Sequence, residues 1–476
     1  RGKYIEDNLV EYGGRGGEAS FLMPDSKVYA EQIPMGSSTL LADLYDLSFD
    51  DILDYLEELG ARLDVGSNEY LDQARQATYL TSPATPPIVD WNYKVIPAFF
   101  ERRSLRQMVE EPLGSIDYLE GWVDKTLVNG EKVEVRAFGA RAVHIIAGNH
   151  PVPALLAIIR NALTRSDAII KLPSNDPLLA LAVARTMCDM APDHPITKHL
   201  AVAYWKGGDI EIEKRVYNPA SVEKIVAWGG FSSIKHVAKY LQPGMELISL
   251  DPKRSASVIG GEAFASEEAM RDVAVRVACD IGAENQVGCV NARVVYVLSG
   301  TDEAGLQKLN QLGQYVYEAM LQLPGHISTK PKNGINRDLR TRLDMCRLDE
   351  DWFRVIGGED EEGAIVISQL PEPVDYWDLL NDRVANFVPI DSIDDALKYF
   401  DAYTQTVGVY PLSLQEELKN KIPLYGAQRL VSLGYCGGSF AFATPQDAIE
   451  PVRRMVKWIV NEKSEGVIPP LWKDEG

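Results

Sequence analysis

The pattern of apolar and polar positions changes character near residue 142. Before that point, the stretch 49–63 places apolar residues at helical spacing and predicts an amphipathic helix. Residues 122–136 predict a β-hairpin, because strand-like runs flank the turn sequence Asn129-Gly130. At the other end of the chain, 448–460 mixes apolar and basic residues at helical spacing, which favours a helix.

From residue 142, short apolar runs alternate with helix-patterned stretches. The expected strands are 143–147, 168–172, 225–228 and 256–259, with helices over 154–163, 178–190 and 234–241. Apolar strands that alternate with helices indicate a parallel sheet covered on both faces. Such sheets bind ligands beyond the carboxyl ends of their strands.

A second α/β stretch begins near Gly261. Met270, Val273, Val277 and Ile281 share a helix face, and a strand over 292–297 follows. Further expected elements are strands at 364–367 and 387–389 and a helix at 394–400. The expected fold class is therefore α/β, with two sheet domains and a cleft between them.

Composition narrows the class of protein. The chain has 476 residues, 46% of them hydrophobic, which suits a globular enzyme of two or three domains. A net charge of −21 argues against a nucleic-acid partner, and no apolar run is long enough to span a membrane. Five scattered cysteines without a CxxC pair, and six histidines without ligand spacing, favour a reducing, cytoplasmic location and no metal site.

Cys289 is the principal candidate for catalysis. It lies at a Gly-flanked junction between a helix-patterned stretch and the strand 292–297, where its sulfur can face a cleft. Upstream, the stretch 145–153 predicts a strand that ends in a loop bearing Asn149. A thiolate and a hydrogen-bond donor for an oxyanion are what acyl chemistry requires. His150 could pass protons, although a histidine beside a turn is more often structural.

Two further motifs suggest a nucleotide site. Lys171 ends a strand and leads toward Ser174, so it could bond a ribose or phosphate; the alternative is a lysine that caps the sheet edge into solvent. Gly229, Gly230 and Ser232 follow a strand and open a helix, whose free amides can hold a diphosphate. A simple tight turn explains these glycines equally well.

In their order along residues 136–457, these motifs resemble the aldehyde dehydrogenase superfamily. They look closest to its acyl-CoA reductase branch, the long-chain fatty acyl-CoA reductase of bacterial bioluminescence and its relatives, which the stretches 386–389 and 426–431 match specifically. The resemblance implies that Cys289 is the nucleophile and Asn149 the oxyanion-binding asparagine. It also implies cofactor contacts, which are expected from Lys171, Ser174, Gly229, Gly230, Ser232 and Leu250.

Two departures from the superfamily pattern bear on the reaction. Ser249 stands where aldehyde oxidisers carry the glutamate that activates the hydrolytic water. Without that base, a thioester at Cys289 should hydrolyse poorly and persist for hydride reduction or for return to a thiol carrier. Ala385 stands where a glutamate usually holds the nicotinamide ribose.

The resemblance implies an aldehyde dehydrogenase-like fold of two parallel-sheet α/β domains. The expected division is a cofactor-binding domain at 1–120 and 141–254, an oligomerisation hairpin at 121–140, a catalytic domain at 255–430 and a C-terminal segment at 431–476. The hairpin predicts a homo-oligomer, either a dimer or a tetramer.

The implied activity is NADPH-dependent reduction of an acyl-CoA or acyl-carrier thioester to an aldehyde. NADH is an alternative, because Asp176 lies close to Ser174 and a carboxylate there would repel a 2′-phosphate. An acyl-activating or acyl-transferring enzyme is a further expected partner. Two other functions stay open: an NAD(P)-dependent aldehyde dehydrogenase, oxidising or CoA-acylating, and a catalytically silent subunit of a multienzyme complex.

Overall fold

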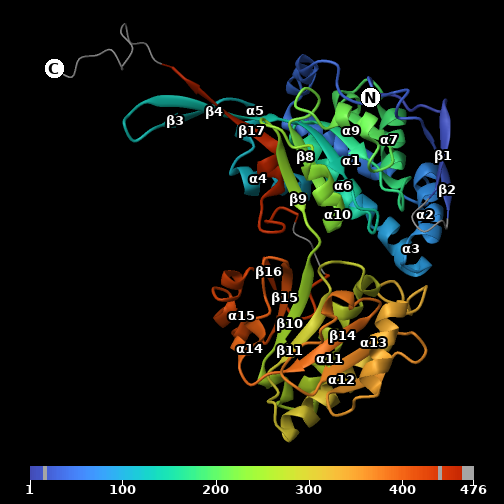
Figure 1. Cartoon of the computed structure of the whole chain (residues 1–476). Helices are drawn as coiled ribbons and strands as arrows, with labels where there is room; N and C mark the ends of the chain where they lie inside the picture. The colour runs from blue at the N-terminus through green and yellow to red at the C-terminus, as the bar shows by residue number, and fades with distance from the viewer. Residues whose placement is uncertain (14–18, 438–441, 464–476) are drawn as a thin grey trace.

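The computed structural model of the chain describes residues 1–13, 19–437 and 442–463. Of the expected C-terminal segment, residues 438–441 and 464–476 lie outside this description. Two α/β units follow one another, and a thin arm of strands projects from the first (Figure 1). After the second unit the chain returns to the first, where Val452 and Val456 join its core.

The first unit is built on a sheet of five parallel strands, counted over the described residues, in the order β7-β6-β5-β8-β9. These strands are β5 (Arg141–Ile145), β6 (Asp167–Lys171), β7 (Leu200–Ala203), β8 (Lys224–Trp228) and β9 (Glu246–Leu250). The helices α6 (Val152–Leu163), α7 (Leu179–Met190) and α10 (Phe231–Ala238) follow β5, β6 and β8. The predicted N-terminal helix is α1 (Phe49–Arg62), which packs against α6 and α7.

The second unit contains seven strands of the described chain in one sheet, ordered β12-β13-β14-β11-β10-β15-β16. They are β10 (Arg254–Ile259), β11 (Ala292–Val297), β12 (Phe353–Gly357), β13 (Ala364–Ser368), β14 (Val384–Pro389), β15 (Thr404–Tyr410) and β16 (Arg429–Ser432). All neighbours are parallel except β12 and β13. The prediction of two parallel sheets is therefore confirmed.

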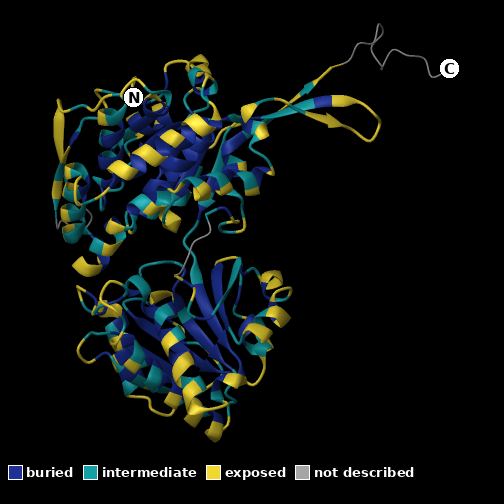
Figure 2. Cartoon of the chain, turned by 180° about the vertical axis from the view of Figure 1, so that it is seen from behind, coloured by how far each residue is buried: buried dark blue, intermediate teal, exposed yellow. Residues whose placement is uncertain are grey.

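Helices cover both faces of the second sheet. On one face, α11 (Glu267–Gly282) and α12 (Glu303–Leu321) share a core with inward residues of β11 and β13. On the other face, α13 (Arg337–Arg347) and α14 (Ile393–Leu397) share a second core with the alternate residues of the same strands. The strands of both sheets are accordingly buried, whereas exposed residues gather on the outer helix faces (Figure 2).

The arm is a three-stranded antiparallel sheet in the described residues, ordered β17-β4-β3. The predicted hairpin consists of β3 (Val123–Thr126) and β4 (Lys132–Gly139), with Gly130 at φ 86° in the turn. The helix predicted over 448–460 is wrong beyond α16 (Pro451–Met455), because the chain continues as β17 (Val456–Glu462). Pairing with β4 gives β17 a complete ladder of hydrogen-bond partners on that edge, which outweighs helical spacing.

Candidate active site

The structure brings the two motifs predicted for catalysis to one place. The short link 251–253 connects the carboxyl end of β9 to the amino end of β10, so these edges of the two sheets face each other. Asn149 and His150 lie in the loop after β5, and Cys289 lies just before β11. His150 Nε2 is 3.0 Å from Glu284 Oε1, which ties this loop to the segment that leads into Cys289.

The segment before Cys289 has an unusual backbone. Glu284, Asn285 and Gln286 all have positive φ angles, of 51°, 54° and 66°. Left-handed conformations cost non-glycine residues about 1–2 kcal/mol each, so surrounding contacts must hold them. Asn285 supplies part of that support, because its Oδ1 accepts a hydrogen bond of 2.8 Å from the Thr329 amide.

Gln286 anchors the same segment to the sheet. Its side chain is completely buried, and its Nε2 donates to the carbonyls of Ala292 and Val384 at 2.9 and 3.0 Å. Its Oε1 accepts from the Val384 amide at 3.0 Å. On the far side of the cysteine, Asn291 Oδ1 accepts from the Gly288 amide at 3.1 Å. The loop that carries Cys289 is therefore held from both ends.

Two residues that were not predicted from the sequence hold the backbone around Cys289. Ser255 Oγ donates to the Cys289 carbonyl at 2.7 Å and accepts from the Thr406 amide at 3.1 Å. Arg293 Nη1 donates to the Asn291 carbonyl at 3.0 Å. The sequence contained a signal for Arg293, because it is a charged residue within the otherwise apolar run of β11. A charge in a buried strand needs partners.

The Cys289 side chain is half-buried, and its surroundings hold it mainly as a thiol. Burial raises the pKa of Cys289, and the carboxylate of Asp447 raises it further, against a hydrogen bond from Gln405 and the charge of Arg293. For Glu284, burial also raises the pKa, but the charge and hydrogen bond of His150 outweigh it and leave the pKa below its ordinary value. Glu284 thus stays a carboxylate that holds His150 in place.

Asn149 itself is exposed on its loop. Behind it, Asn175 Nδ2 donates to the Gly148 carbonyl at 3.1 Å and joins the loop after β5 to the loop after β6. A Cβ added at Gly148 would lie 2.5 Å from Asn175 Oδ1, so glycine is needed for this close approach. The loop that carries Asn149 is therefore held in place by its hydrogen bond to the loop after β6.

The residues predicted to hold a nucleotide line the carboxyl edge of the first sheet. Lys171 ends β6 with its Nζ 5.4 Å from the ring centre of Tyr204, and Ser174 follows in a half-buried loop. Gly229 and Gly230 lie between β8 and α10. Ser232 is exposed in the first turn of α10. Leu250 is buried at the end of β9.

The backbone of this turn is uncovered at Gly230. A Cβ added at Gly230 would meet no atom within 4 Å, so the backbone at the start of α10 is open to a ligand. Asp176, whose proximity left the choice of cofactor open, is buried and accepts a hydrogen bond from the Leu179 amide at 3.3 Å. Burial raises the pKa of Asp176 to about 6, and its hydrogen bond with the Leu179 amide lies in the first turn of α7.

The two departures from the superfamily pattern occupy different settings. Ser249 is half-buried in β9, beside Ala227 of β8. Ala385 is completely buried in β14 and belongs to the core under α11 and α12. A small apolar residue suits that core, and it offers no polar group to a ribose.

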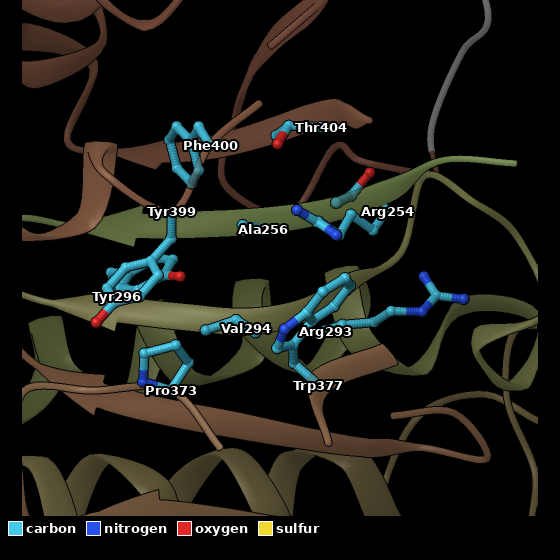
Figure 3. A pocket seen from close by; sticks show the side chains of 11 residues that line it. Arg254, Ala256, Arg293, Val294, Tyr296, Pro373, Trp377, Tyr399, Phe400 and Thr404 are labelled. Carbon is cyan, nitrogen blue, oxygen red and sulfur yellow. The ribbon is translucent and has the colours of Figure 1, made fainter. Parts of the chain in front are cut away.

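A small cavity of about 100 Å³ lies at the amino ends of β10 and β11 (Figure 3). Aromatic side chains that include Tyr296, Trp377 and Phe400 wall it, together with Arg254 and Arg293. An apolar cavity of about 150 Å³ holds one benzene molecule, so this space is too small for a long acyl chain. A larger cavity of about 420 Å³ lies between the N-terminal segment, α7 and β7, and none of the predicted site residues lines it.

Within the described ranges, no group of three or more His, Cys, Asp or Glu side chains is arranged to hold a metal ion. No helix in the same ranges has the length and apolar character needed to cross a bilayer.

Comparison with known proteins places this site in a family. The family model described as acyl-CoA reductase (LuxC) matches residues 44–458, which is most of the chain. The chain belongs to the acyl-CoA reductase (LuxC) family. The family is one of aldehyde-forming oxidoreductases, as the resemblance of the motifs implied.

Similar curated relatives are the long-chain acyl-protein thioester reductases of Aliivibrio fischeri and Vibrio harveyi. Each is 27% identical to this chain; the alignments cover 90% and 88% of it, and 85% and 84% of the relatives.

Solved structures share the fold at low identity. The NADP-dependent glyceraldehyde-3-phosphate dehydrogenase of Bacillus halodurans matches with a TM-score of 0.70 at 11% identity, over 97% of both chains. The lactaldehyde dehydrogenase of Escherichia coli matches with a TM-score of 0.68 at 13% identity, over 96% of both chains. The expected aldehyde dehydrogenase-like fold is thereby confirmed.

Proposed function

We propose that this protein reduces an acyl thioester, carried by CoA or by a protein, to an aldehyde through an acyl-enzyme at Cys289. The observation that carries the proposal is the His150–Glu284 contact of 3.0 Å, which joins the loop of Asn149 to the segment of Cys289. The names of the relatives from Aliivibrio fischeri and Vibrio harveyi support a thioester as the substrate.

In this mechanism the Cys289 thiolate attacks the thioester carbonyl. The oxyanion that develops is held by the Asn149 side chain and by the backbone N–H of Cys289. The carbonyl re-forms as the thiol carrier leaves, and the acyl group stays on the sulfur. The hydrogen bonds of Gln286 and Asn291 keep the sulfur in position through these steps, so little reorganisation is needed when the substrate binds.

A nicotinamide nucleotide, when bound, supplies the hydride that reduces the acyl-enzyme. Lys171 and Ser174 would hold its ribose and Gly229, Gly230 and Ser232 its diphosphate, and Leu250 would be a further contact. Cys289 then carries a thiohemiacetal, which collapses to release the aldehyde and restore the thiolate.

NADPH is the proposed cofactor. The buried position of Asp176 supports this choice, because a carboxyl group that is buried and hydrogen-bonded to the Leu179 amide is less exposed to a 2′-phosphate than a free one at the strand edge. Initial rates with NADPH and NADH at equal concentrations measure the preference.

The test of the mechanism is acyl labelling of the Cys289→Ala variant. Incubation with radioactive acyl-CoA, in the absence of reductant, should label the wild-type protein and leave this variant unlabelled and inactive. Cys279→Ala is the matched control, because Cys279 is also half-buried but lies within α11. Retained labelling of Cys289→Ala would remove Cys289 from the mechanism.

We also propose that the arm of β3, β4 and β17 joins copies of this chain into a dimer or tetramer. Its exposed apolar residues, among them Leu127, Val128, Ile459 and Val460, support this role. The unpaired state of all five cysteines supports a cytoplasmic location, where an acyl-activating or acyl-transferring enzyme would be the partner that supplies the thioester.

A further inference from the structure

Cys289 is a central residue of a tight backbone turn. The Asn291 amide donates to the Gly288 carbonyl at 3.3 Å, which closes a four-residue turn with Cys289 and Val290 in its middle. The closing bond uses the N–H of the fourth residue and leaves the N–H of the second residue without a partner in the turn. Among the residues that the structure describes, the Cys289 N–H donates to no other residue. The turn therefore leaves an unused backbone donor at the cysteine.

Both peptide groups that meet at Cys289 are held by side chains. Ser255 Oγ donates to the Cys289 carbonyl at 2.7 Å. On the other side, Arg293 Nη1 donates to the Gly288 carbonyl at 3.4 Å. The C=O of Gly288 and the N–H of Cys289 belong to one planar trans peptide group, in which they point in opposite directions. A donor that holds this carbonyl thus also sets the direction of the Cys289 N–H.

The guanidinium of Arg293 holds two more carbonyls of the same loop. Its Nη1 also donates to the Asn291 carbonyl at 3.0 Å, and its Nη2 donates to the Gln286 carbonyl at 3.4 Å. The three carbonyls come from residues before and after Cys289. A guanidinium can hold them together because its N–H groups lie in a rigid planar fork, whereas the ammonium of a lysine is a single point of contact.

A structural ion pair does not account for Arg293. Among the described residues, no carboxylate lies within 4.0 Å of its guanidinium, so no counter-ion offsets the free-energy cost of a charge in β11. In Figure 3 its side chain extends away from Tyr296 and Tyr399, which wall the small cavity. All the hydrogen bonds of the guanidinium in the described chain go to carbonyls of the loop that carries Cys289.

We propose that Arg293 is a positioning residue for acylation: by holding the Gly288 carbonyl, it aims the Cys289 N–H at the oxyanion. This proposal rests on the proposed function, in which that N–H and the Asn149 side chain share the oxyanion. As the sulfur–carbon bond forms, an electron pair of the thioester carbonyl moves to its oxygen, where the aimed N–H meets the negative charge. A donor that is already aligned needs no reorganisation at this moment.

The experiment compares two reactions of the same thiol in Arg293→Lys, which keeps the positive charge and removes the fork. Acylation by radioactive acyl-CoA without reductant, followed by rapid quenching, passes through an oxyanion. It should slow by about 10²-fold, as when one oxyanion donor is lost. Alkylation by iodoacetamide, followed by mass spectrometry of the Cys289 peptide, forms no oxyanion and should keep the wild-type rate.

A transition-state analogue gives a second readout. A trifluoromethyl ketone with the acyl chain of the substrate adds to the thiolate and bears an oxyanion on its former carbonyl. Its inhibition constant should rise in Arg293→Lys by about the factor by which acylation slows, because both depend on the same donor. Arg271→Lys is the matched control for both readouts, since Arg271 is exposed on α11 and pairs with Glu267.

If circular dichroism shows that Arg293→Lys is unfolded, Arg293→Gln takes its place. This variant loses the charge as well as the fork, so both reactions are then compared at a pH at which the thiol is fully ionised. The same result is expected, with slow acylation and unchanged alkylation.

Two results would overturn the proposal. Acylation of Arg293→Lys at the wild-type rate would mean that the N–H needs no help from the guanidinium. Equal slowing of acylation and alkylation would mean that Arg293 holds the sulfur and not the N–H. If Cys289→Ala still becomes acylated, the proposed function fails; if that variant is inert and Arg293→Lys is acylated normally, only the role of Arg293 fails.

Discussion

Replacing Gln286 with leucine is expected to loosen the segment that carries Cys289. Gln286 is completely buried three residues before Cys289, and its side chain makes three hydrogen bonds to backbone groups of Ala292 and Val384. Leucine has a similar volume and no polar atoms, so the substitution removes the hydrogen bonds without opening a large cavity.

The loss of unfolding free energy depends on the hydrogen bonds that are removed and on the partners that the backbone groups keep. Three hydrogen bonds at roughly 1 kcal/mol each amount to about 3 kcal/mol. The Val384 amide also donates to the Asn381 carbonyl at 3.0 Å, so this donor keeps a partner and the loss is smaller. The expected destabilisation is about 2–3 kcal/mol, which lowers a urea midpoint by about 1–1.5 M when unfolding has a slope of about 2 kcal/mol per M.

The assay should report on the second unit alone, because a chain of two units need not unfold in one step. Hydrogen exchange at increasing urea, read from peptides that cover β11 and β14, gives a local midpoint. Gln307→Leu is the matched control: Gln307 is exposed on α12, and its side chain has only a 3.4 Å contact with Glu303. Without urea, acyl labelling of Cys289 in Gln286→Leu should also be slower, since the left-handed segment has lost its anchor.

A midpoint for Gln286→Leu within about 0.3 M of the control would refute this reasoning, because roughly 0.5 kcal/mol is what an exposed substitution costs. It would mean that the buried amide of Gln286 contributes no more to the free energy of unfolding than the exposed amide of Gln307. Normal acyl labelling together with the full loss of stability would show that Gln286 supports the sheet and does not position the sulfur.

Two predictions concern the reaction. Asn149→Ala should lower turnover by about 10²–10³-fold with little change in thermal stability, since the side chain is exposed and would be needed only when the oxyanion forms; unchanged steady-state turnover would exclude an oxyanion role. Ser249→Glu should give faster hydrolysis of the acyl-enzyme or measurable aldehyde oxidation, because it places a carboxylate in β9 at the position of the missing base. The two assays measure released acid and aldehyde-dependent reduction of the nucleotide. If neither activity increases, the missing base does not determine the product.

Local patterns along the chain identified many of the main elements. The helix at 49–62, the strands β5, β6, β8 and β11, and the helices that follow β5, β6 and β8 were predicted to within a few residues, because their cores are continuous apolar runs or regular stripes. The helix that follows β11, α12, was not predicted. Strands β7 and β15 were not predicted. In β15, the polar residues Thr404, Gln405 and Thr406 interrupt the apolar pattern, although all three are buried in the structure.

The residues of the site also fall into those that local motifs predicted and those that only the fold brings together. Cys289, Asn149 and the glycines before α10 were found from motif order, since each motif lies within a few consecutive residues. Ser255 had no such signal, because its partner Cys289 is 34 residues away along the chain. Only Arg293 was readable, as a lone charge in an apolar strand.

The amino-acid sequence by itself determined the alternation of strands and helices, the two sheets, and the cysteine and asparagine that resemble a thioester-reducing site. Tertiary structure decided how that cysteine is held: which side chains and backbone groups anchor its segment, and how far burial raises the pKa of its thiol. The physical reason is range. Hydrophobic periodicity acts between near neighbours in sequence, whereas the protonation of a buried thiol depends on every charge within a few ångströms, wherever the chain brings it from.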